Sequence, residues 1–513
     1  MRSRLKRLVV CLSLANLLFI EAWIQVRFGY LANHLKHPPS TIGLTILCDV
    51  IVLGLLFFVA DMALARWRWR GVLERYAIVL SFVLIVKTLN GRFTYIWLVP
   101  LLKIGSSNWA LGLTGGLALA GGIYWLSHWR RLTGWLFRGA LILSPFLLFN
   151  VVFVAVGLIH GDADYRELPR RAAARSRHGP RVVWIIFDTL DYHYAFEQRP
   201  AWLKMPELDR LRSQSVDFTY ALAPGPRTEV SIPALMTRKV LADSVSERPN
   251  DLRLVLRDGT SLSFREQRTV FADAEEMGAR TALVGFHIPY GRIIGKQVSE
   301  CDWWQWPNQF RSGESAVVSA LRSFAFVPSK PFTTRLSAAR QIENHIEEMN
   351  AAKRVACDPG FRLAFLHFVP PHQLGMYDPA SAEYTVSKIL AHNWYFDNLA
   401  LADASFRQLR RAMEQAGTWD TSLVIVTADH SWRLAGSNGY RVYPRIPFLC
   451  HLPSASSRIL VPGRMNTLCT YDLVLAYLSG RIGSPQALAG WVEVWTAAHP
   501  EVPLTDDPIA LRP

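Results

Sequence analysis

The stretch RVVWIIFDTLD, residues 181–191, decides the fold of the second half of this chain. It is a continuous run of β-branched and aromatic residues that leads into an acidic residue, Asp188. Such a run is typical of a strand buried on both faces of a parallel sheet. Three later stretches have the same character: GARTALVGFH (278–287), FRLAFLHFVPPH (361–372) and TSLVIVTADH (421–430). The sequence therefore predicts several buried strands, each followed by polar side chains.

Helical patterns separate these predicted strands. Residues 387–417 have helical periodicity over several turns, residues 205–224 favour a helix followed by a short strand, and residues 227–238 favour a loop that enters a helix. Strands that alternate with helices predict an α/β domain with a mostly parallel central sheet and helices on both faces. We expect this domain to occupy residues 181–513. Ligands of such sheets bind beyond the carboxyl ends of the strands.

The first 160 residues have a different composition, with long apolar runs separated by Arg-rich loops. Because about 20 mainly apolar residues cross a bilayer as a helix, we expect a transmembrane domain of about five spans over residues 1–160. A signal peptide is the alternative for the first run, but no small-residue cleavage site follows it. The expected spans are residues 8–26, 41–64, 76–89, 109–126 and 136–159.

The basic loops predict the orientation of these spans. MRSRLKR, ARWRWRGVLER and SHWRRLTGWLFR fall on the same side of a five-span arrangement, and the positive-inside rule makes that side the cytoplasm. We therefore expect an inner (plasma) membrane protein with a cytoplasmic N-terminus and a periplasmic or extracellular C-terminal domain. Residues 161–180 are polar and basic and predict a juxtamembrane linker.

The charge and cysteine content exclude other classes of protein. Much of the net charge of +15 flanks apolar runs, which indicates lipid headgroups as partners and argues against nucleic acid. The chain has six cysteines, and the four in the second half form no CxxC pair, so we expect no zinc knuckle. In an oxidising compartment these four would have the means to form up to two disulfides.

Acidic and imidazole side chains follow two of the predicted strands. Asp188 ends one, and the pair Asp429 and His430 ends another. Together they offer the oxygen and nitrogen ligands that suit one divalent metal ion, with Zn²⁺ or Mn²⁺ as our expectation. The alternative is a capping aspartate and a surface histidine. Asp191 and His193 are candidates for an additional ligand or for a solvated loop.

Thr228 is the predicted nucleophile. It lies in PGPRTEVSIPALM just before a predicted helix, where a hydroxyl also serves as a helix cap. Free backbone N–H groups at a helix N-terminus hold phosphoryl oxygens, and coordination to a metal lowers the pKa of a hydroxyl enough for attack. Ser231 is the alternative nucleophile.

Two histidines and two arginines complete the predicted site. His367 and His372 flank LHFVPPH, where an imidazole either protonates a leaving alcohol or holds a phosphoryl oxygen. We expect His372 to be catalytic and His367 to bind substrate. Arg227 and Arg433 lie next to the other candidates and are expected to pair with a substrate anion.

Several stretches resemble, in order, the motifs of the alkaline phosphatase and sulfatase superfamily. They run from about residue 181 to 480 and are IIFDTLD, MPELDRLRSQSVDFTYALAP, RTEVSIPALMTR, YFDNLALADASFRQL, VTADHS and LCTYDLVLAYL. A five-span anchor with an outward domain is similar to the phosphoethanolamine transferases and, more loosely, to the lipoteichoic-acid synthases. The resemblance implies that Thr228 attacks, that Asp188, Asp429 and His430 bind metal together with Thr228, and that His372 contacts the substrate phosphate.

The resemblance also implies a reaction. The expected function is metal-dependent transfer of a phospho-alcohol group, phosphoethanolamine or phosphoglycerol, from a membrane phospholipid to a surface glycan or lipid through phospho-Thr228. The alternatives are a membrane-bound phosphodiesterase, phosphatase or sulfatase-like hydrolase, and a non-catalytic glycan-binding or sensor protein. The nucleophile loop lacks the CxPxR or SxPxR motif of formylglycine sulfatases, Ser431 replaces a frequent Gly, and GSNGYRVYPRIP lacks a further His of the transferases.

Overall fold

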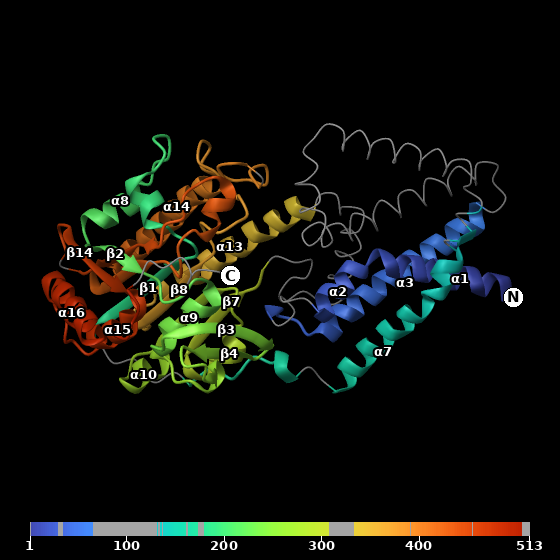
Figure 1. The fold of residues 1–513 in the computed structure, drawn as a ribbon, viewed down its shortest axis with the longest axis horizontal. Coiled ribbons are helices and arrows are strands. Elements are labelled where there is room, and N and C mark those ends of the chain that lie inside the picture. Colours follow the sequence, from blue (N-terminus) through green and yellow to red (C-terminus); the bar gives the residue numbers. More distant parts are fainter. Residues whose placement is uncertain are drawn as a thin grey trace. The chain divides into compact units, whose positions relative to one another are not determined.

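The chain forms two compact units in a computed structural model (Figure 1). The structure describes residues 2–28, 34–64, 131–306 and 333–504, with short gaps at 132–133, 136, 161–162, 173–178, 390 and 454. The first unit comprises Met1–Ala32, His37–Ala163 and Gln309–Thr333. The second unit comprises Asn33–Lys36, Asp164–Asn308 and Thr334–Pro513.

A nine-stranded sheet forms the centre of the second unit. Its order is β12-β2-β13-β11-β1-β8-β6-β7, with β14 paired to β2. The run β11-β1-β8-β6-β7 is parallel throughout, whereas β13 is antiparallel to both β11 and β2. The mostly parallel sheet predicted from the sequence is therefore present. The strands are β1 (Arg181–Phe187), β2 (Val216–Leu222), β6 (Thr281–Phe286), β7 (Glu300–Trp304), β8 (Leu363–Phe368), β11 (Ser422–Thr427), β12 (Arg445–Ile446), β13 (Phe448–His451) and β14 (Ile459–Asn466).

Strand β1 lies in the middle of the sheet, and every one of its residues is buried. It pairs in parallel with β11 on one side and β8 on the other, with Ile186 opposite both Thr427 and His367. A strand covered on both faces needs apolar residues at every position, which explains the unbroken run RVVWIIF. The carboxyl ends of β1, β8 and β11 therefore meet at one edge of the sheet.

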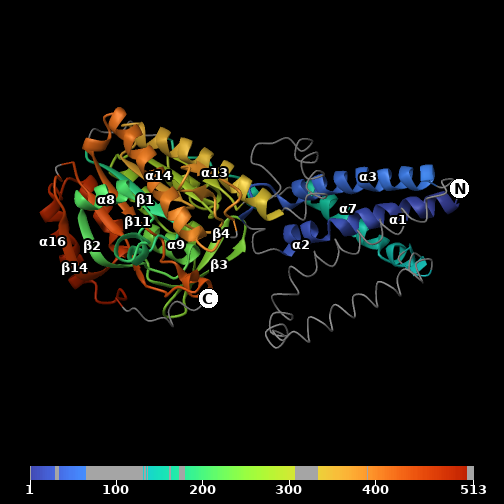
Figure 2. The same cartoon turned by 90° about the horizontal axis from the view of Figure 1, so that it is seen from above.

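Helices cover both faces of this sheet, as predicted. In Figure 1, α8, α13 and α14 lie on one side of the strands and α9, α10 and α15 on the other. Figure 2 shows α13 and α14 running side by side, and His345 Nε2 of α13 lies 2.9 Å from Ser405 Oγ of α14. The helices are α8 (Pro206–Ser213), α9 (Thr228–Thr237), α10 (Val270–Glu276), α11 (Tyr290–Ile293), α13 (Thr333–Cys357), α14 (Trp394–Gln415), α15 (Thr470–Leu478) and α16 (Pro485–Ala498).

A small antiparallel sheet was not expected from the sequence. Strands β3 (Leu241–Arg248), β4 (Asp251–Leu256) and β5 (Ser261–Ser263) form a meander directly after α9. Its residues alternate between buried and exposed only in part, so the periodic signal of a half-buried strand is weak. A further two-residue pair, β9 (Tyr377–Asp378) and β10 (Glu383–Tyr384), follows β8.

The first unit contains α1 (Arg2–Leu18), α2 (Ile20–Phe28), α3 (Pro39–Leu64) and α7 (Ser144–His160). Two stretches of its described residues, Pro39–Ala63 and Phe137–His160, are helices long and apolar enough to cross a membrane. They coincide with the spans expected at 41–64 and 136–159.

The other three expected spans are not seen as single helices among the described residues. The span expected at 8–26 is divided between α1 and α2. The spans expected at 76–89 and 109–126 lie outside the described residues. The five-span arrangement thus stays a prediction.

Polar side chains join the helices of the first unit. Asn16 Oδ1 accepts hydrogen bonds from Trp23 Nε1 at 3.0 Å and from Asn150 Nδ2 at 2.9 Å. Arg7 pairs with Asp61 at 2.9 Å, which links α1 to α3. Such contacts hold helices together where apolar surfaces alone give little specificity.

The cysteines of both units are unpaired. Cys301, Cys357, Cys450 and Cys469 of the second unit and the two cysteines of the first are free thiols, so the disulfides considered from the sequence do not form here.

Candidate metal centre and nucleophile

The three predicted ligands come together at the carboxyl ends of β1 and β11. Asp188 directly follows β1, and Asp429 and His430 follow β11, its parallel neighbour. One potential ligand atom from each of the three lies within 4.8 Å of the others, and all three side chains are buried. Neighbouring parallel strands that end in acids therefore produce the cluster directly from the topology.

His430 presents the correct nitrogen to this cluster. Its Nδ1 lies 2.9 Å from the carbonyl oxygen of Ser431, and a carbonyl oxygen only accepts, so Nδ1 carries the proton. The lone pair is then on Nε2, which lies 3.6 Å from Asp188 Oδ1 and 3.5 Å from Asp429 Oδ2. The replacement of the frequent Gly by Ser431 leaves this backbone carbonyl in place.

Asp429 is held by hydrogen bonds on both oxygens. Its Oδ1 accepts from the backbone N–H groups of Thr189 at 3.1 Å and His430 at 2.8 Å. Its Oδ2 accepts from Thr228 Oγ1 at 2.7 Å. Burial acts to raise the pKa of Asp429, but the nearby His430 and His367 and these hydrogen bonds hold that pKa below its ordinary value. Asp429 is therefore the ionised member of the pair.

Asp188 is in a less favourable position as a bare carboxylate. Burial and the negative charge of Asp429 raise its pKa well above the ordinary value. Its Oδ1 is buried and accepts no hydrogen bond from the described residues. A buried carboxyl oxygen without a hydrogen-bond partner, a second carboxylate and an imidazole lone pair are the donor atoms that a cation would take. These residues fit a divalent metal ion.

Thr228 is the first residue of α9, and its hydroxyl donates to the carboxylate of Asp429. The first N–H groups of a helix have no partner within the helix, and the helix dipole favours an anion there. The predicted nucleophile therefore lies where a phosphoryl oxygen would be stabilised. Ser231, the alternative nucleophile, instead donates from Oγ to the carbonyl oxygen of Gly225 at 2.8 Å and is buried.

Thr189 stores strain beside the cluster. It is a β-branched residue with φ of 64°, a region that such residues rarely adopt. Its N–H bonds Asp429, and its carbonyl oxygen accepts from Tyr395 Oη at 2.9 Å. Strained backbone of this kind persists where surrounding contacts hold it, and such positions cluster at functional sites.

The two predicted histidines lie beside the cluster and are neutral near pH 7. His367 is the fifth residue of β8, fully buried, with Nδ1 3.0 Å from Tyr290 Oη. His372 is in the loop after β8, with Nδ1 3.2 Å from the carbonyl oxygen of Gln373. Burial lowers the pKa of each to about 4, and the charges of Asp429 and His430 act on both. They suit hydrogen bonding to a substrate better than protonating a leaving group.

The two predicted arginines have different environments. Arg227 pairs with Asp243 and donates to the carbonyl oxygen of Ser244 at 2.7 Å, so its guanidinium is occupied by β3. Arg433 forms no ion pair with the described residues, its Nε is buried without a hydrogen bond, and its charge acts on Asp188. Of the two, only Arg433 remains suited to pairing with a substrate anion.

Asp191 and His193 do not join the ligand cluster. Asp191 Oδ1 accepts from the backbone N–H groups of His193 at 2.9 Å and Tyr194 at 3.3 Å, and burial raises its pKa to about 7. His193 pairs with Glu197 at 2.9 Å and stacks on Tyr443. Both residues therefore shape the loop that follows Asp188.

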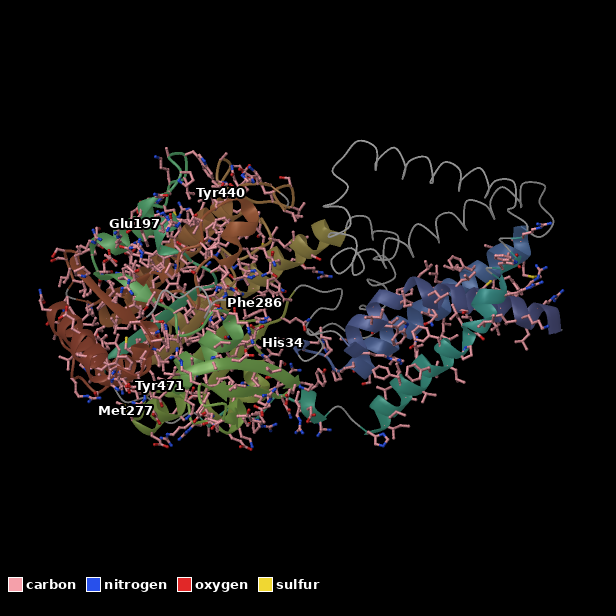
Figure 3. The ribbon with its side chains drawn as sticks, in the orientation of Figure 1. His34, Glu197, Met277, Phe286, Tyr440 and Tyr471 are labelled. Carbon is pink, nitrogen blue, oxygen red and sulfur yellow. The ribbon has the colours of Figure 1, made fainter. Side chains whose placement is uncertain are left out.

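The structure adds His287 and Glu229 to the site. His287 directly follows β6, which pairs with β8 in the sheet. Its Nε2 lies 2.5 Å from Oε1 of Glu229, the residue after Thr228. The sequence contains a pattern that indicates His287, because GARTALVGFH also has a polar residue at the carboxyl end of a predicted buried strand. Figure 3 shows the neighbouring Phe286 close to His34, a residue that no sequence pattern places there.

No protein-family model matches the sequence, and no curated protein matches it. Solved structures with a partial likeness include a phosphonate monoester hydrolase from Silicibacter pomeroyi, at 14% identity and TM-score 0.38 over 58% of this chain and 73% of that chain. A sulfatase from Pseudoalteromonas sp. has 15% identity and TM-score 0.39 over 58% and 68%. A protein of the alkaline phosphatase superfamily from Vibrio parahaemolyticus has 15% identity and TM-score 0.38 over 61% and 69%.

Proposed function

We propose that this protein transfers a phospho-alcohol group, phosphoethanolamine or phosphoglycerol, from a membrane phospholipid to a surface glycan or lipid. The observation that carries the proposal is the 2.7 Å hydrogen bond from Thr228 Oγ1 to Asp429 Oδ2, at the first turn of α9 and beside Asp188 and His430. A buried hydroxyl with a carboxylate partner, a helix N-terminus and a cation site together favour attack on a phosphorus centre.

Asp188, Asp429, His430 and Thr228 would hold one divalent ion, with Zn²⁺ or Mn²⁺ the best match to oxygen and imidazole ligands. Bound there, the ion would supply a Lewis acid and lower the pKa of the Thr228 hydroxyl. The hydrogen bond that fixes the tautomer of His430 and the backbone N–H groups that bond Asp429 would orient these two side chains toward the ion.

The residues of the chain have separate tasks in the reaction. The oxygen of Thr228 attacks phosphorus, the bond from phosphorus to the diacylglycerol oxygen breaks, and phospho-Thr228 forms. An acceptor hydroxyl then attacks the same phosphorus and releases Thr228. The N-terminal N–H groups of α9 and the guanidinium of Arg433 hold the phosphoryl oxygens, and neutral His372 and His367 offer hydrogen bonds to them.

Two apolar helices support a lipid donor. Pro39–Ala63 and Phe137–His160 have the length and composition of membrane spans. An anchored enzyme meets a lipid substrate at high effective concentration. We propose an inner-membrane protein whose second unit lies outside the cytoplasm, where phospholipid headgroups and surface glycans are both present.

The mass of the peptide that contains Thr228 tests this function. The full-length protein is incubated with Zn²⁺ or Mn²⁺ and with vesicles of phosphatidylethanolamine or phosphatidylglycerol, then digested. We expect a phosphoethanolamine or phosphoglycerol adduct on Thr228 in the wild type and in S231A, and none in T228A. An adduct on Ser231, or no adduct and no lipid turnover in any preparation, would overturn the proposal. Lipid turnover with release of the free phospho-alcohol and no labelled acceptor would make the protein a hydrolase.

A further inference from the structure

His287 is fixed on nearly every side. It has φ of 72°, in the left-handed region. Its N–H donates to the carbonyl oxygen of Trp304 at 2.8 Å, which closes the ladder between β6 and β7. Its ring nitrogen Nε2 lies 2.5 Å from Glu229 Oε1, and the ring is 6% exposed. A strained residue that several contacts hold in one orientation is typical of functional sites.

His34 supplies two of the contacts that hold His287. Its Nδ1 lies 3.0 Å from the carbonyl oxygen of His287, and because a carbonyl only accepts, His34 Nδ1 is the donor. The two rings are stacked with centroids 4.7 Å apart and an interplanar angle of 15°. Burial lowers the pKa of His34 to about 3, so its ring is neutral and stacks without charge repulsion. Figure 3 labels His34 close to Phe286, at the end of β6.

The segment that carries His34 is itself anchored in the second unit. It is Asn33–Lys36, which in the sequence lies between the helices α2 and α3. Arg292 Nη1 donates to the carbonyl oxygen of Leu35 at 2.7 Å, and the N–H of Lys36 donates to Gln305 Oε1. His34 is 1% exposed. These contacts show that the position of the His34 ring is built into the fold of the second unit.

Glu229 determines which nitrogen of His287 is available. A carboxylate beside Nε2 accepts its hydrogen, which leaves Nδ1 as the nitrogen that exchanges a proton with another molecule. Nδ1 is buried and forms no hydrogen bond with the described residues. The His287 ring contacts Glu229, the residue next to Thr228. It also lies 6.0 Å from the ring of Trp306, which lies 5.0 Å from the ring of His372, so His287 borders the same group of side chains.

We propose that His287 exchanges the proton with the departing and the incoming alcohol, and that His34 is its positioning residue. This inference rests on the proposed function. His287 enters the first step with a proton on both ring nitrogens, and its Nδ1–H gives one to the diacylglycerol oxygen as the bond from that oxygen to phosphorus breaks. In the second step, Nδ1 takes the proton of the acceptor hydroxyl as the acceptor oxygen bonds to phosphorus. Thr228 gives its proton to solvent before it attacks and takes one back when it is released, so no proton is gained or lost over the cycle.

His287 and His372 differ in their hydrogen bonds. His372 Nδ1 faces the carbonyl oxygen of Gln373, and no carboxylate orients its ring among the described residues. His287 has a carboxylate on one nitrogen and an unbonded second nitrogen, which is the arrangement of an oriented acid–base imidazole.

Two soluble phosphoethanolamine diesters test the inference on the full-length enzyme. One releases p-nitrophenol and the other a simple alkyl alcohol. Loss of a proton donor slows turnover of the alkyl ester, because an alkoxide is a poor leaving group. Turnover of the nitrophenyl ester is less affected, because p-nitrophenolate leaves without being protonated. We expect H287Q to lower kcat on the alkyl ester roughly 100-fold and to change turnover of the nitrophenyl ester far less. We expect H34A to act in the same direction and more weakly.

Three further variants separate positioning from folding. H34N keeps a donor towards the His287 carbonyl and is expected to restore part of the alkyl-ester turnover that H34A loses. H34F keeps the stacked ring without the donor, so it measures the stack alone. H499A removes a histidine that stacks on Trp495 in the far helix α16, and it is expected to behave as the wild type. Melting temperature and bound-metal content are measured for every variant.

The outcomes are distinct. An equal loss on both esters in H34A and H287Q, or no loss in either, would overturn the roles of these histidines and leave the proposed function in place. Wild-type enzyme that turns over neither ester, or T228A that matches it, would overturn the proposed function and the inference with it. Selective loss on the alkyl ester, with partial rescue by H34N, supports the inference.

Discussion

The Nδ1 of His430 lies 2.9 Å from the carbonyl oxygen of Ser431, its neighbour in the chain. This hydrogen bond leaves the Nε2 lone pair facing Asp188 and Asp429. We expect H430A to lose bound metal, whereas S431G keeps it because the backbone carbonyl remains. Metal content after dialysis and the melting temperature with and without chelator check this. Saturating metal at about 100 times its Kd would add about 2.7 kcal/mol to the stability of the folded state. Equal metal content in H430A and S431G would contradict the assignment.

Arg433 and Arg441 both follow His430 in the chain but differ in their environments, so a variant of Arg441 is a control for a variant of Arg433. Arg433 has a buried Nε without a partner among the described residues, and its charge acts on Asp188. Arg441 is exposed and lies over the ring of Tyr443, 5.4 Å from its centroid. We expect R433A to weaken inhibition by inorganic phosphate by about 10- to 100-fold, since a charge-assisted hydrogen bond contributes about 1.5–3 kcal/mol. R441A is expected to leave the inhibition constant unchanged. A similar effect of both variants would show that Arg433 acts only through the overall charge of the loop.

The sequence predicted the part of the site that depends on local pattern. Asp188, Asp429 and His430 follow unbroken apolar runs, and parallel pairing of those runs makes the side chains meet. His287 follows the same pattern at the end of the predicted strand GARTALVGFH, although it was not among the predicted site residues. Arg227 was predicted to bind substrate, but in the structure its guanidinium pairs with Asp243 of the unexpected strand β3.

No local sequence pattern predicts the contact between His34 and His287. His34 is 253 residues away from His287 in the chain, and its short segment has neither a strand nor a long helical pattern. His34 comes before α3 and α7 in the chain, whereas His287 follows β6 in the sheet of the second unit. No periodicity in the sequence reports that distance, so only the three-dimensional structure brings His34 to the site.

Asp217 is a buried acid whose loss is expected to destabilise the second unit. It is fully buried in β2 and accepts from Arg212 at 2.8 Å and from Arg458 at 2.5 Å. Asp209 pairs with Arg199 at 2.5 Å but is 47% exposed. We expect D217A to lower the free energy of unfolding by about 3 kcal/mol, because it leaves two arginines without their shared partner. D209A should cost about 0–1 kcal/mol. Thermal melting of both variants decides, and equal shifts would contradict the role of burial.

Gly225 controls the position of the nucleophile helix. A Cβ at this residue would lie 2.6 Å from Val230 Cγ1 and 3.1 Å from Ser231 Oγ, inside α9. We expect G225A to displace the first turn of α9 and lower kcat at least 10-fold, since misplacing a reacting group by about 1 Å costs about 100-fold. Gly463 in β14 has open space around it, so G463A is the control and should keep wild-type turnover. Unchanged kcat in G225A would show that α9 adapts without moving Thr228.

Asp403 in α14 makes the stability of the second unit depend on pH. Its Oδ1 accepts from the backbone N–H groups of Glu207 at 3.0 Å and Leu208 at 2.8 Å, at the start of α8. Burial raises its pKa from the ordinary 3.8 to about 7. A raised pKa means that the folded state favours the protonated acid, so this stability is present below pH 4 and is lost as pH rises through 7.

The isosteric variant D403N separates this contribution from all other titrating groups. Asparagine keeps the acceptor oxygen for both N–H groups and does not ionise. Between pH 5 and pH 8 we expect the wild type to lose about 2 kcal/mol more stability than D403N. Asp191, whose pKa is also about 7, titrates in both proteins and cancels from the comparison. Melting temperatures of the two proteins at pH 5 and pH 8 provide the measurement. Parallel curves for wild type and D403N would mean that Asp403 stays ionised in the folded protein, held by the two N–H donors of α8.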